Sequence, residues 1–338
     1  MNTLLHNLLT THSVTGCEDA ARKIIGDYAK NWASHISSDN VGNLIVRENP
    51  AEGGILLAAH MDEIGLMVNY ISDDGMLHVC KVGGIYIPMY FGHMVRIFTK
   101  NGPIYGSVSV KRSLYTQDAK VSDILIDIGA RSKEDAGKYV EVGDVITFDS
   151  DYHELLNGRI CGRNLDDKTG VYVIMEALRR AKEMGLKGSV SAVATVGEET
   201  SQNGACWAAS RLKPRLAIVV DVTYTSDTPH GSKPEDYGEI ALGKGPAICI
   251  NPIINRVHIE ELRTVAKNLN INLQYEASSC ATCTDADRIH YAADGVEVLL
   301  VSIPLRYMHS ACETGALQDM EDCINLISNY LLYLDENA

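Results

Sequence analysis

Aspartate, glutamate and histidine residues follow several of the apolar runs of this chain. They are His60, Asp62, Asp166, Asp167, Glu198, Glu199, Asp221 and His309. Charged side chains at the ends of buried segments are costly unless they are paired or coordinate a metal ion. Imidazole and carboxylate ligands together suit borderline cations such as Zn²⁺, Co²⁺ or Mn²⁺. If these residues converge, they predict a metal centre of the kind that activates water for hydrolysis.

Two short motifs suggest which of these residues would bind metal and which would orient a ligand or face the attacking water. In an extended segment, residues two apart point to the same face, so Asp62 could accept a hydrogen bond from the imidazole of His60 and orient it as a ligand. The adjacent residues Glu198 and Glu199 point in different directions. One of them could therefore bind metal while the other faces the attacking water.

Each residue also has a structural explanation. A lone histidine after a strand is more often a hydrogen-bonded core or surface residue than a ligand. Asp166 and Asp167 stand just before an amphipathic segment and could cap its helix. The glutamate pair could form a solvated turn, and Asp221 could cap another. The joint arrangement favours the metal centre over these separate explanations.

The elements that would position these residues alternate between strand and helix. The predicted strands are Val41–Val46, Gly54–Ala59, Ser189–Val196, Leu216–Val222 and Val298–Ile303, and the predicted helices are Cys17–Ala33, Val171–Met184, Ile259–Leu269 and Gln318–Leu334. This alternation predicts an α/β fold with a mixed, mostly parallel sheet sandwiched by helices. Ligands of such sheets sit at the carboxyl ends of the strands, where most of the residues above would lie.

The middle of the chain has a different character. Helical periodicity nearly vanishes there, and turn signals such as Gly83-Gly84 and Asn101-Gly102-Pro103 separate short β-type runs. These runs are Leu66–Ile71, Met76–Val82, Met94–Phe98, Gly106–Val110, Ile124–Ile128 and Val145–Phe148. We expect residues 66–156 to form an inserted β-rich, barrel-like domain. The insert would interrupt one catalytic domain made of residues 1–65 and 157–338.

Composition narrows the classes of partner. The 338 residues are 46% hydrophobic and carry a formal net charge of −14, which argues against a nucleic-acid partner because that affinity comes mainly from Lys and Arg. No run approaches the ~18 apolar residues of a membrane span. Residues 1–11 lack the basic start and long apolar run of a secretory signal. We expect a cytoplasmic protein with no membrane partner.

The nine cysteines are irregularly spaced. Cys280 and Cys283 form a single CxxC, and the second pair that a structural zinc site needs is absent from the sequence. We therefore expect scattered, buried thiols in a reducing compartment. The long stretch from Arg112 to Ser122 could cover the site or face a neighbouring subunit, and the sequence does not decide between these.

The motifs resemble those of the M42 family of metallo-aminopeptidases, which includes the tetrahedral TET, glutamyl and deblocking aminopeptidases. The matching segments are Ala-Ala-His60-Met-Asp62-Glu-Ile-Gly, Gly-Arg-Asn-Leu-Asp166-Asp167-Lys-Thr-Gly, Val-Gly-Glu198-Glu199-Thr-Ser-Gln-Asn-Gly-Ala, Val-Val-Asp221-Val-Thr-Tyr-Thr-Ser-Asp-Thr-Pro, Gly-Lys-Gly-Pro-Ala-Ile, Thr284-Asp285-Ala and Ile-Pro-Leu-Arg-Tyr-Met-His309-Ser. They occur in the family's order and span nearly the whole chain. The resemblance implies a zinc-exopeptidase-like fold.

The resemblance also implies a set of metal ligands. His60 and Asp221 would hold one divalent ion, Glu199 and His309 would hold a second, and Asp166 would bridge the two. The ions would be Zn²⁺ or Co²⁺, with Mn²⁺ as an alternative.

The remaining implied roles concern catalysis and assembly. Glu198 would be the general base that activates a water bridging the two ions, and Asp62 would be the partner of a ligand histidine. The enzyme would hydrolyse N-terminal residues from peptides. The insert would be a dimerisation domain, and dimers could assemble into a tetrahedral dodecamer.

Some positions depart from the commonest family pattern. Lys168 stands where Arg is usual, Thr200-Ser201 where Val-Gly is frequent, and His230 and Cys283 where Gly is usual or frequent. None removes a proposed ligand, so they leave the substrate preference open rather than the reaction. The alternatives are a glycoside hydrolase, because paired carboxylates also do that chemistry, a metal-dependent carboxypeptidase or deacylase, and a non-catalytic shell-forming subunit.

Overall fold

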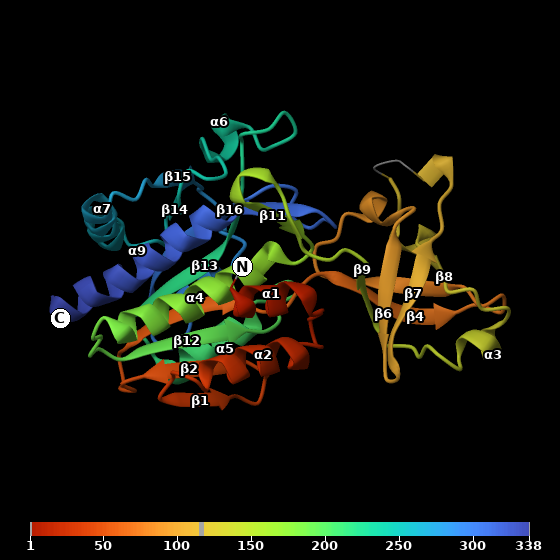
Figure 1. Ribbon diagram of the computed structural model, residues 1–338, viewed down its shortest axis with the longest axis horizontal. Helices are drawn as coiled ribbons and strands as arrows, with labels where there is room; N and C mark the ends of the chain where they lie inside the picture. Colours follow the sequence, from red (N-terminus) through yellow and green to blue (C-terminus); the bar gives the residue numbers. More distant parts are fainter. Residues whose placement is uncertain (1, 115–117, 338) are drawn as a thin grey trace.

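Runs of small and β-branched residues form the central strands of an eight-stranded sheet. The computed structural model describes residues 2–114 and 118–337, and Figure 1 shows this sheet beside a barrel. The strands of the sheet are β1 (His35–Ser38), β2 (Leu44–Glu48), β3 (Ile55–His60), β12 (Val190–Thr195), β13 (Leu216–Tyr224), β14 (Ala247–Ile250), β15 (Gln274–Ala277) and β16 (Glu297–Leu305). Their order is β1-β2-β12-β3-β13-β16-β14-β15, and the central strands β12, β3, β13 and β16 run parallel. The predicted mixed, mostly parallel sheet is confirmed.

Helices pack against this sheet in two groups. Their bounds are α1 (Thr3–Thr10), α2 (Asp19–Ala29), α4 (Leu165–Glu183), α5 (Asn203–Leu212), α6 (Pro234–Tyr237), α7 (Arg256–Leu269), α8 (Ala286–His290) and α9 (Leu317–Glu336). Helices α2, α1, α4, α9 and α7 form one chain of contacts, and α5 contacts α8 in the other group. The short helix α6 has no buried residue and lies outside both groups. Within the described ranges, none of the helices has a stretch long and apolar enough to cross a membrane.

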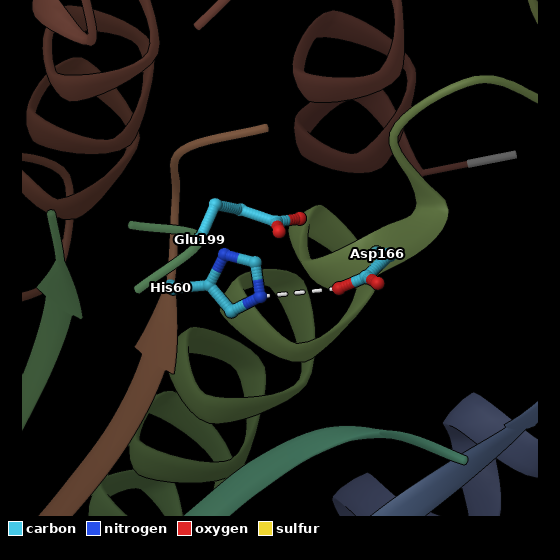
Figure 2. Close-up of side chains that lie close together, drawn as sticks. All are labelled: His60, Asp166 and Glu199. Atoms are coloured by element: carbon cyan, nitrogen blue, oxygen red, sulfur yellow. Dashed lines mark hydrogen bonds and ion pairs between the residues drawn. The ribbon is translucent and has the colours of Figure 1, made fainter. Parts of the chain in front are cut away.

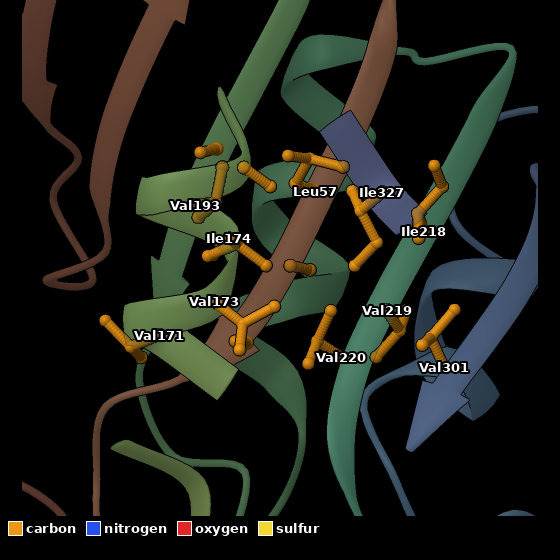
Figure 3. Close-up of a cluster of buried hydrophobic side chains, with 14 of the residues drawn as sticks. Leu57, Val171, Val173, Ile174, Val193, Ile218, Val219, Val220, Val301 and Ile327 are labelled. Atoms are coloured by element: carbon orange, nitrogen blue, oxygen red, sulfur yellow. The ribbon is translucent and has the colours of Figure 1, made fainter. Parts of the chain in front are cut away.

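The core lies between the sheet and helices α4 and α9. Figure 3 shows Ile174 of α4 and Ile327 of α9 beside Leu57 of β3 and Ile218 of β13. All four side chains are fully buried, and each such aliphatic side chain contributes roughly 1.5–3 kcal/mol relative to its exposed state. This packing makes the carboxyl ends of the central strands a rigid support.

A closed barrel lies to one side of the sheet, at the right in Figure 1. Its strands are β4 (Gly65–Ile71), β5 (Leu77–Val82), β6 (Met94–Thr99), β7 (Gly102–Val108), β8 (Leu125–Asp127) and β9 (Val145–Phe148), in the order β4-β5-β8-β7-β6-β9, with α3 (Lys133–Ala136) between the last two in sequence. The barrel has a hydrophobic core of its own, separate from that of the sheet. The predicted barrel is confirmed, whereas the domain limits 66–156 stay a prediction.

The remaining elements are short. They are β10 (His153–Glu154), β11 (Arg159–Gly162) and β17 (Glu313–Ala316), which form a small antiparallel sheet, and the 3-10 helices η1 (Ile87–Tyr90), η2 (Arg112–Leu114), η3 (Val121–Asp123) and η4 (Leu156–Gly158). Residues 115–117, in the middle of the stretch that could cover the site, lie outside the described residues. The role of that stretch therefore stays open.

Several expected bounds need correction. The segment Gly102-Pro103, expected to be a turn, begins β7, where Pro103 pairs with Phe98 of β6. On its other side β7 pairs with β8 only at Ser107 and Val108. Pro103 therefore needs no backbone N–H for pairing on that side. The sequence reading also missed α1, α5 and the strands β1, β14 and β15, which lack the long apolar runs of the central strands.

Candidate metal centre

The candidate site lies where two central strands part. Backbone pairing between β3 and β13 ends at Ala58 and Val219, and His60 and Asp221 follow in the gap that opens beyond this pair. An opening of this kind at the carboxyl ends of parallel strands is where ligands of α/β sheets bind. His60, Asp166, Glu198, Glu199, Asp221 and His309 all line one cavity of about 1100 Å³ at this position.

The carboxylate of Asp166 lies between two imidazoles. Its Oδ1 is 3.1 Å from Nε2 of His60, and its Oδ2 is 3.2 Å from Nε2 of His309. Figure 2 shows His60 and Asp166 pointing toward one another, with Glu199 beside them. Nε2 of His309 is also 3.4 Å from Oε1 of Glu199, and Nε2 of His60 is 4.0 Å from Oδ1 of Asp221. Each Nε2 atom therefore has a carboxylate besides Asp166 within 4.0 Å, and that of His60 has two, because Oε2 of Glu198 lies 3.9 Å from it.

Both imidazoles are held at their second ring nitrogen. Nδ1 of His309 is 2.9 Å from the carbonyl oxygen of Gly84, and Nδ1 of His60 is 3.1 Å from the carbonyl oxygen of Asp62. Because a carbonyl oxygen only accepts, Nδ1 donates in both rings, and a neutral ring then presents a lone pair at Nε2. Both Nε2 atoms face the cavity, where a bound metal ion would take the place of a proton.

The side chain of Asp62 does more than the sequence suggested. Its Oδ1 is 3.5 Å from Nδ1 of His60, so the closer partner of the ring is the backbone carbonyl of the same residue. The carboxylate accepts hydrogen bonds from the Thr15 hydroxyl at 2.7 Å and from the backbone N–H groups of Glu198 and Glu199 at 3.2 and 3.3 Å. Asp62 thus holds the turn that carries both glutamates.

The two aspartates at the start of α4 have different surroundings. Asp166 and Asp167 have non-helical backbone angles, and Oδ1 of Asp167 accepts the backbone N–H of Gly170 at 3.0 Å. Asp167 therefore caps the helix, which is the structural role that the sequence also allowed for this residue. The carboxylate of Asp166 faces the cavity instead. A Cβ atom at Gly170 would lie 2.3 Å from the Asp167 carboxylate, so this cap needs glycine.

The donor atoms suit divalent cations. The ligand atoms of His60, Asp166 and Glu199 all lie within 4.8 Å of one another, and so do those of His60, Asp167 and Asp221. Asp167 was not among the expected ligands, and its Oδ2 is buried with no hydrogen-bond partner among the described residues. Imidazole nitrogens and carboxylate oxygens that lie this close together suit Zn²⁺, Co²⁺ or Mn²⁺ as ligands. The residues present therefore fit a metal centre.

The electrostatics of the cavity reflect an excess of buried carboxylates. Burial alone would lower the pKa of His60, but hydrogen bonds to Asp166 and Asp62 outweigh it and raise that pKa well above its usual value. Burial likewise opposes the charged ring of His309, yet contacts with Asp166 and Glu199 raise its pKa to about 12. Without another cation, protons on the imidazoles are what compensate the carboxylates.

Among the carboxylates of the cavity, the charged form is stabilised for Asp166 and destabilised for several others. Burial would raise the pKa of Asp166, but its two imidazole neighbours lower it below the usual range. Burial raises the pKa of Glu198 to about 9, with His60 opposing and Asp221 adding to the rise. Burial also raises the pKa values of Glu199 and Asp221. These groups hold negative charge at a cost that a bound cation would remove.

Two further features were not expected at the site, although Gly83-Gly84 was predicted to form a turn. The buried carboxylate of Glu313 accepts the backbone N–H of His309 at 2.8 Å and that of Asp166 at 3.2 Å, so it ties two separate loops together. The loop of Gly83 and Gly84 passes close behind the site, and a Cβ atom at Gly83 would lie 2.8 Å from Ile64. Adjacent glycines after a strand are the signal that could have identified this loop.

A second buried charged cluster lies next to the first. Glu63 contacts Arg163, and its Oε1 lies 3.2 Å from Nζ of Lys168. Backbone N–H of Ser13 donates to Glu63 at 2.7 Å, and Lys168 donates to the carbonyl oxygen of Thr11 at 2.7 Å. Burial opposes the charge on Glu63, but the two cations lower its pKa to about 2. The cluster fastens the segment after α1 to the start of α4.

The two cysteines of the CxxC motif are not buried as expected. All nine cysteines are free, but only Cys249 and Cys323 are buried, while Cys280 and Cys283 are exposed on the wall of the cavity. The prediction of buried thiols is wrong for this pair, which lies in the loop between β15 and α8, and also for Cys312, which is exposed. The carboxylate of Asp287 accepts the backbone N–H of Cys283 at 2.9 Å and thereby shapes that loop.

Comparison with known proteins places the chain among peptidases. Residues 42–326 match the model of the M42 glutamyl aminopeptidase family. Lysyl aminopeptidase from Pyrococcus furiosus is 33% identical over 96% of this chain and 94% of its own length. A TET aminopeptidase from a marine sediment archaeon of the Thaumarchaeota has a TM-score of 0.92 at 31% identity, with 99% of this chain and 96% of that chain covered. The Pyrococcus horikoshii TET1 peptidase, which can assemble into a tetrahedron or a large octahedral shell, has a TM-score of 0.85 at 31% identity, covering 96% and 97%.

Proposed function

The chain belongs to the M42 peptidase family, and from this premise we propose that it is a two-metal aminopeptidase that releases N-terminal residues from peptides. The observation that carries the proposal is the carboxylate of Asp166, which lies between the imidazoles of His60 and His309 with one oxygen toward each. A carboxylate in that position suits a ligand shared between two ions.

We assign the proposed ligands as one histidine and one further carboxylate for each ion. His60 and Asp221 would hold one ion, and His309 and Glu199 would hold the other, with Asp166 shared. Bound divalent ions would supply Lewis-acid activation of the scissile carbonyl and of the attacking water. Zn²⁺ and Co²⁺ are the ions we propose, with Mn²⁺ as an alternative.

Glu198 is the proposed general base. It lines the same cavity as the ligands, and its Oε2 lies 3.9 Å from Nε2 of His60. Gln202 donates to its Oε1 at 3.0 Å, and Asp62 accepts its backbone N–H, so its carboxylate is positioned from both ends. The side chain would accept a proton from the attacking water and deliver it to the departing amine. Without a cation, burial raises the pKa of Glu198 to about 9. Bound cations would lower that pKa and leave the carboxylate ionised to accept the first proton.

Assembly is the less direct part of the proposal. A homo-oligomer is supported by the similar TET1 peptidase, which forms closed shells. We propose that the barrel makes the first dimer contact, because Met94, Tyr105 and Val142 expose large apolar surface on it. A tetrahedral dodecamer of such dimers and a cytoplasmic location stay predictions from the sequence.

A panel of peptides with defined metals tests the proposed function. Peptides with free N-termini should be shortened from that end, chelation should abolish the activity, and Zn²⁺ or Co²⁺ should restore it. Peptides with acetylated N-termini should resist.

Each rival predicts a different result in the same assays. Hydrolysis of β-glucan that survives chelation would identify a glycoside hydrolase. Release of C-terminal residues or acyl groups would identify a carboxypeptidase or deacylase. No hydrolysis with any of the three metals would leave a non-catalytic subunit.

A further inference from the structure

The wall of the cavity beyond the metal centre carries a carboxylate that the proposed reaction does not use. We infer that Glu276 selects substrates whose N-terminal residue has a basic side chain, lysine or arginine. This inference rests on the proposed aminopeptidase function and names its substrate class.

The position of Glu276 relative to the metal centre suits the first side chain of a substrate. On β13, Thr223 stands two residues after Asp221, so both side chains point to the same face of the strand, about 6–7 Å apart along it. The hydroxyl of Thr223 donates to Oε2 of Glu276 at 2.6 Å. Glu276 lines the same cavity as Asp221. A long side chain on a residue bound at the metal centre therefore reaches the Glu276 carboxylate.

The charge of Glu276 lacks a compensating cation. Among the described residues, its hydrogen-bond partner is the neutral Thr223, and no Lys, Arg or His forms an ion pair with it. Burial raises its pKa, and the Thr223 hydroxyl only partly opposes this. A half-buried carboxylate gains most from a ligand that brings an ammonium or guanidinium group.

The rest of the cavity agrees with a basic side chain. Glu235 and Asp236 of α6 are exposed at the cavity wall and add negative potential, whereas Arg288 is the cationic lining residue that opposes them. Tyr224 and Tyr237 also line the cavity and can contact the apolar stem of a lysine while its charged end reaches Glu276. An N-terminal glutamate or aspartate would instead meet like charge, which disfavours it.

The first test uses the unmodified holoenzyme and the p-nitroanilides of lysine, norleucine and glutamate. Lysine and norleucine p-nitroanilides have side chains of similar length and differ in the terminal ammonium group, and neither has a second side chain. We expect kcat/KM for the lysine substrate to exceed that for norleucine roughly 10- to 100-fold, the range for a hydrogen bond to a charged group. Equal values, or a preference for norleucine or glutamate, would overturn the inference.

A variant locates the selectivity at Glu276. Glu276→Gln keeps an acceptor for Thr223 but removes the charge. The ratio of kcat/KM for lysine to that for norleucine should therefore fall to within about threefold of one, because a neutral side chain makes no charge-assisted bond to the lysine ammonium. The matched control is Glu239→Gln, which changes an exposed glutamate outside this cavity and should keep the lysine preference. A preference that survives Glu276→Gln would overturn the assignment.

Failure of the inference is distinguishable from failure of the proposed function. If the metal-loaded protein hydrolyses none of the aminoacyl substrates, the aminopeptidase proposal fails and the inference fails with it. If it hydrolyses norleucine or glutamate substrates without favouring lysine, the function stands and only the inference fails.

Discussion

Two buried charged clusters lie side by side in this molecule and are built in opposite ways. In one, Glu63 is compensated by Arg163 and Lys168, cations that the chain itself supplies. In the other, Asp166 has imidazole neighbours, but burial raises the pKa values of Glu198 and Asp221, and neighbouring carboxylates add to the rise. The two clusters share the same supports, since β3 and the loop after it carry His60 and Glu63.

The contrast shows which cluster is structural and which is poised for chemistry. Buried ionic groups that are fully paired hold segments together, whereas buried groups of one sign need a ligand of the other. Burial is therefore not what separates a functional site from the rest of the core here. The two clusters differ in whether their buried charge is compensated. Replacing a carboxylate by an amide should therefore have a different effect in each cluster.

The largest effect should come from Asp166→Asn, which removes the shared carboxylate of the uncompensated cluster. An amide is neutral and a weaker ligand, so we expect loss of bound metal and abolition of peptidase activity together. Metal content by elemental analysis and turnover of an aminoacyl p-nitroanilide measure both. Full metal occupancy in this variant would contradict the shared position of Asp166.

The next largest should come from Glu198→Gln, which keeps the shape of the cavity but removes the proposed base. We expect kcat to fall about 10²- to 10⁴-fold, the usual contribution of general acid–base catalysis, with metal content unchanged. Near-normal turnover in a metal-loaded variant would exclude Glu198 as the base. Comparison with the preceding variant separates loss of the base from loss of the ions.

The compensated cluster should respond in stability instead. Glu63→Gln leaves Arg163 and Lys168 buried without their carboxylate, so we expect the free energy of unfolding to fall by about 3–5 kcal/mol, with metal content unchanged. Chemical denaturation measures this, and Glu183→Gln, which breaks the largely exposed pair with Arg179, is the control expected to cost under about 1 kcal/mol. A variant as stable as wild type would show that the pair is not structural.

The same carboxylate sets an acid limit. Its pKa lies near 2 in the folded protein and at 4.5 in the reference state, so its contribution is complete above pH 4.5 and is lost as the pH falls toward 2. Part of the acid sensitivity of the wild type in that window should be missing in Glu63→Gln. Identical acid unfolding curves would contradict the lowered pKa.

The smallest effect should be the pH response of the metal-free protein. The pKa of Glu198 is about 9 in the fold against 4.5 in the reference state, so stability is lost as pH rises through that window, by up to about 1.4 kcal/mol per pH unit for each proton involved. Chelated protein should therefore melt at a lower temperature at pH 8 than at pH 6, and metal should reduce the difference. A melting temperature that rises over this interval without metal would contradict the uncompensated charge.

Much of this arrangement follows from patterns in the sequence. The apolar runs that became β3 and β13 are continuous, and the polar residues that end these runs, His60 and Asp221, are the ones that enter the cavity. Glu313 could not be identified this way, because it lies in the short strand β17 and acts through backbone groups distant in sequence. The exposure of Cys280 likewise depends on how a loop without periodicity is placed.

The hydrogen bond between His309 and Gly84 has a consequence for the history and the engineering of the molecule. Gly84 belongs to the loop after β5 of the barrel, and its carbonyl oxygen selects which nitrogen of His309 faces the cavity. Excision of the barrel would remove that acceptor and free the ring to change tautomer, and a barrel exchanged from a relative would have to place a carbonyl oxygen at the same point. The barrel is thus not a detachable module, and the two parts must be inherited and redesigned as a single unit.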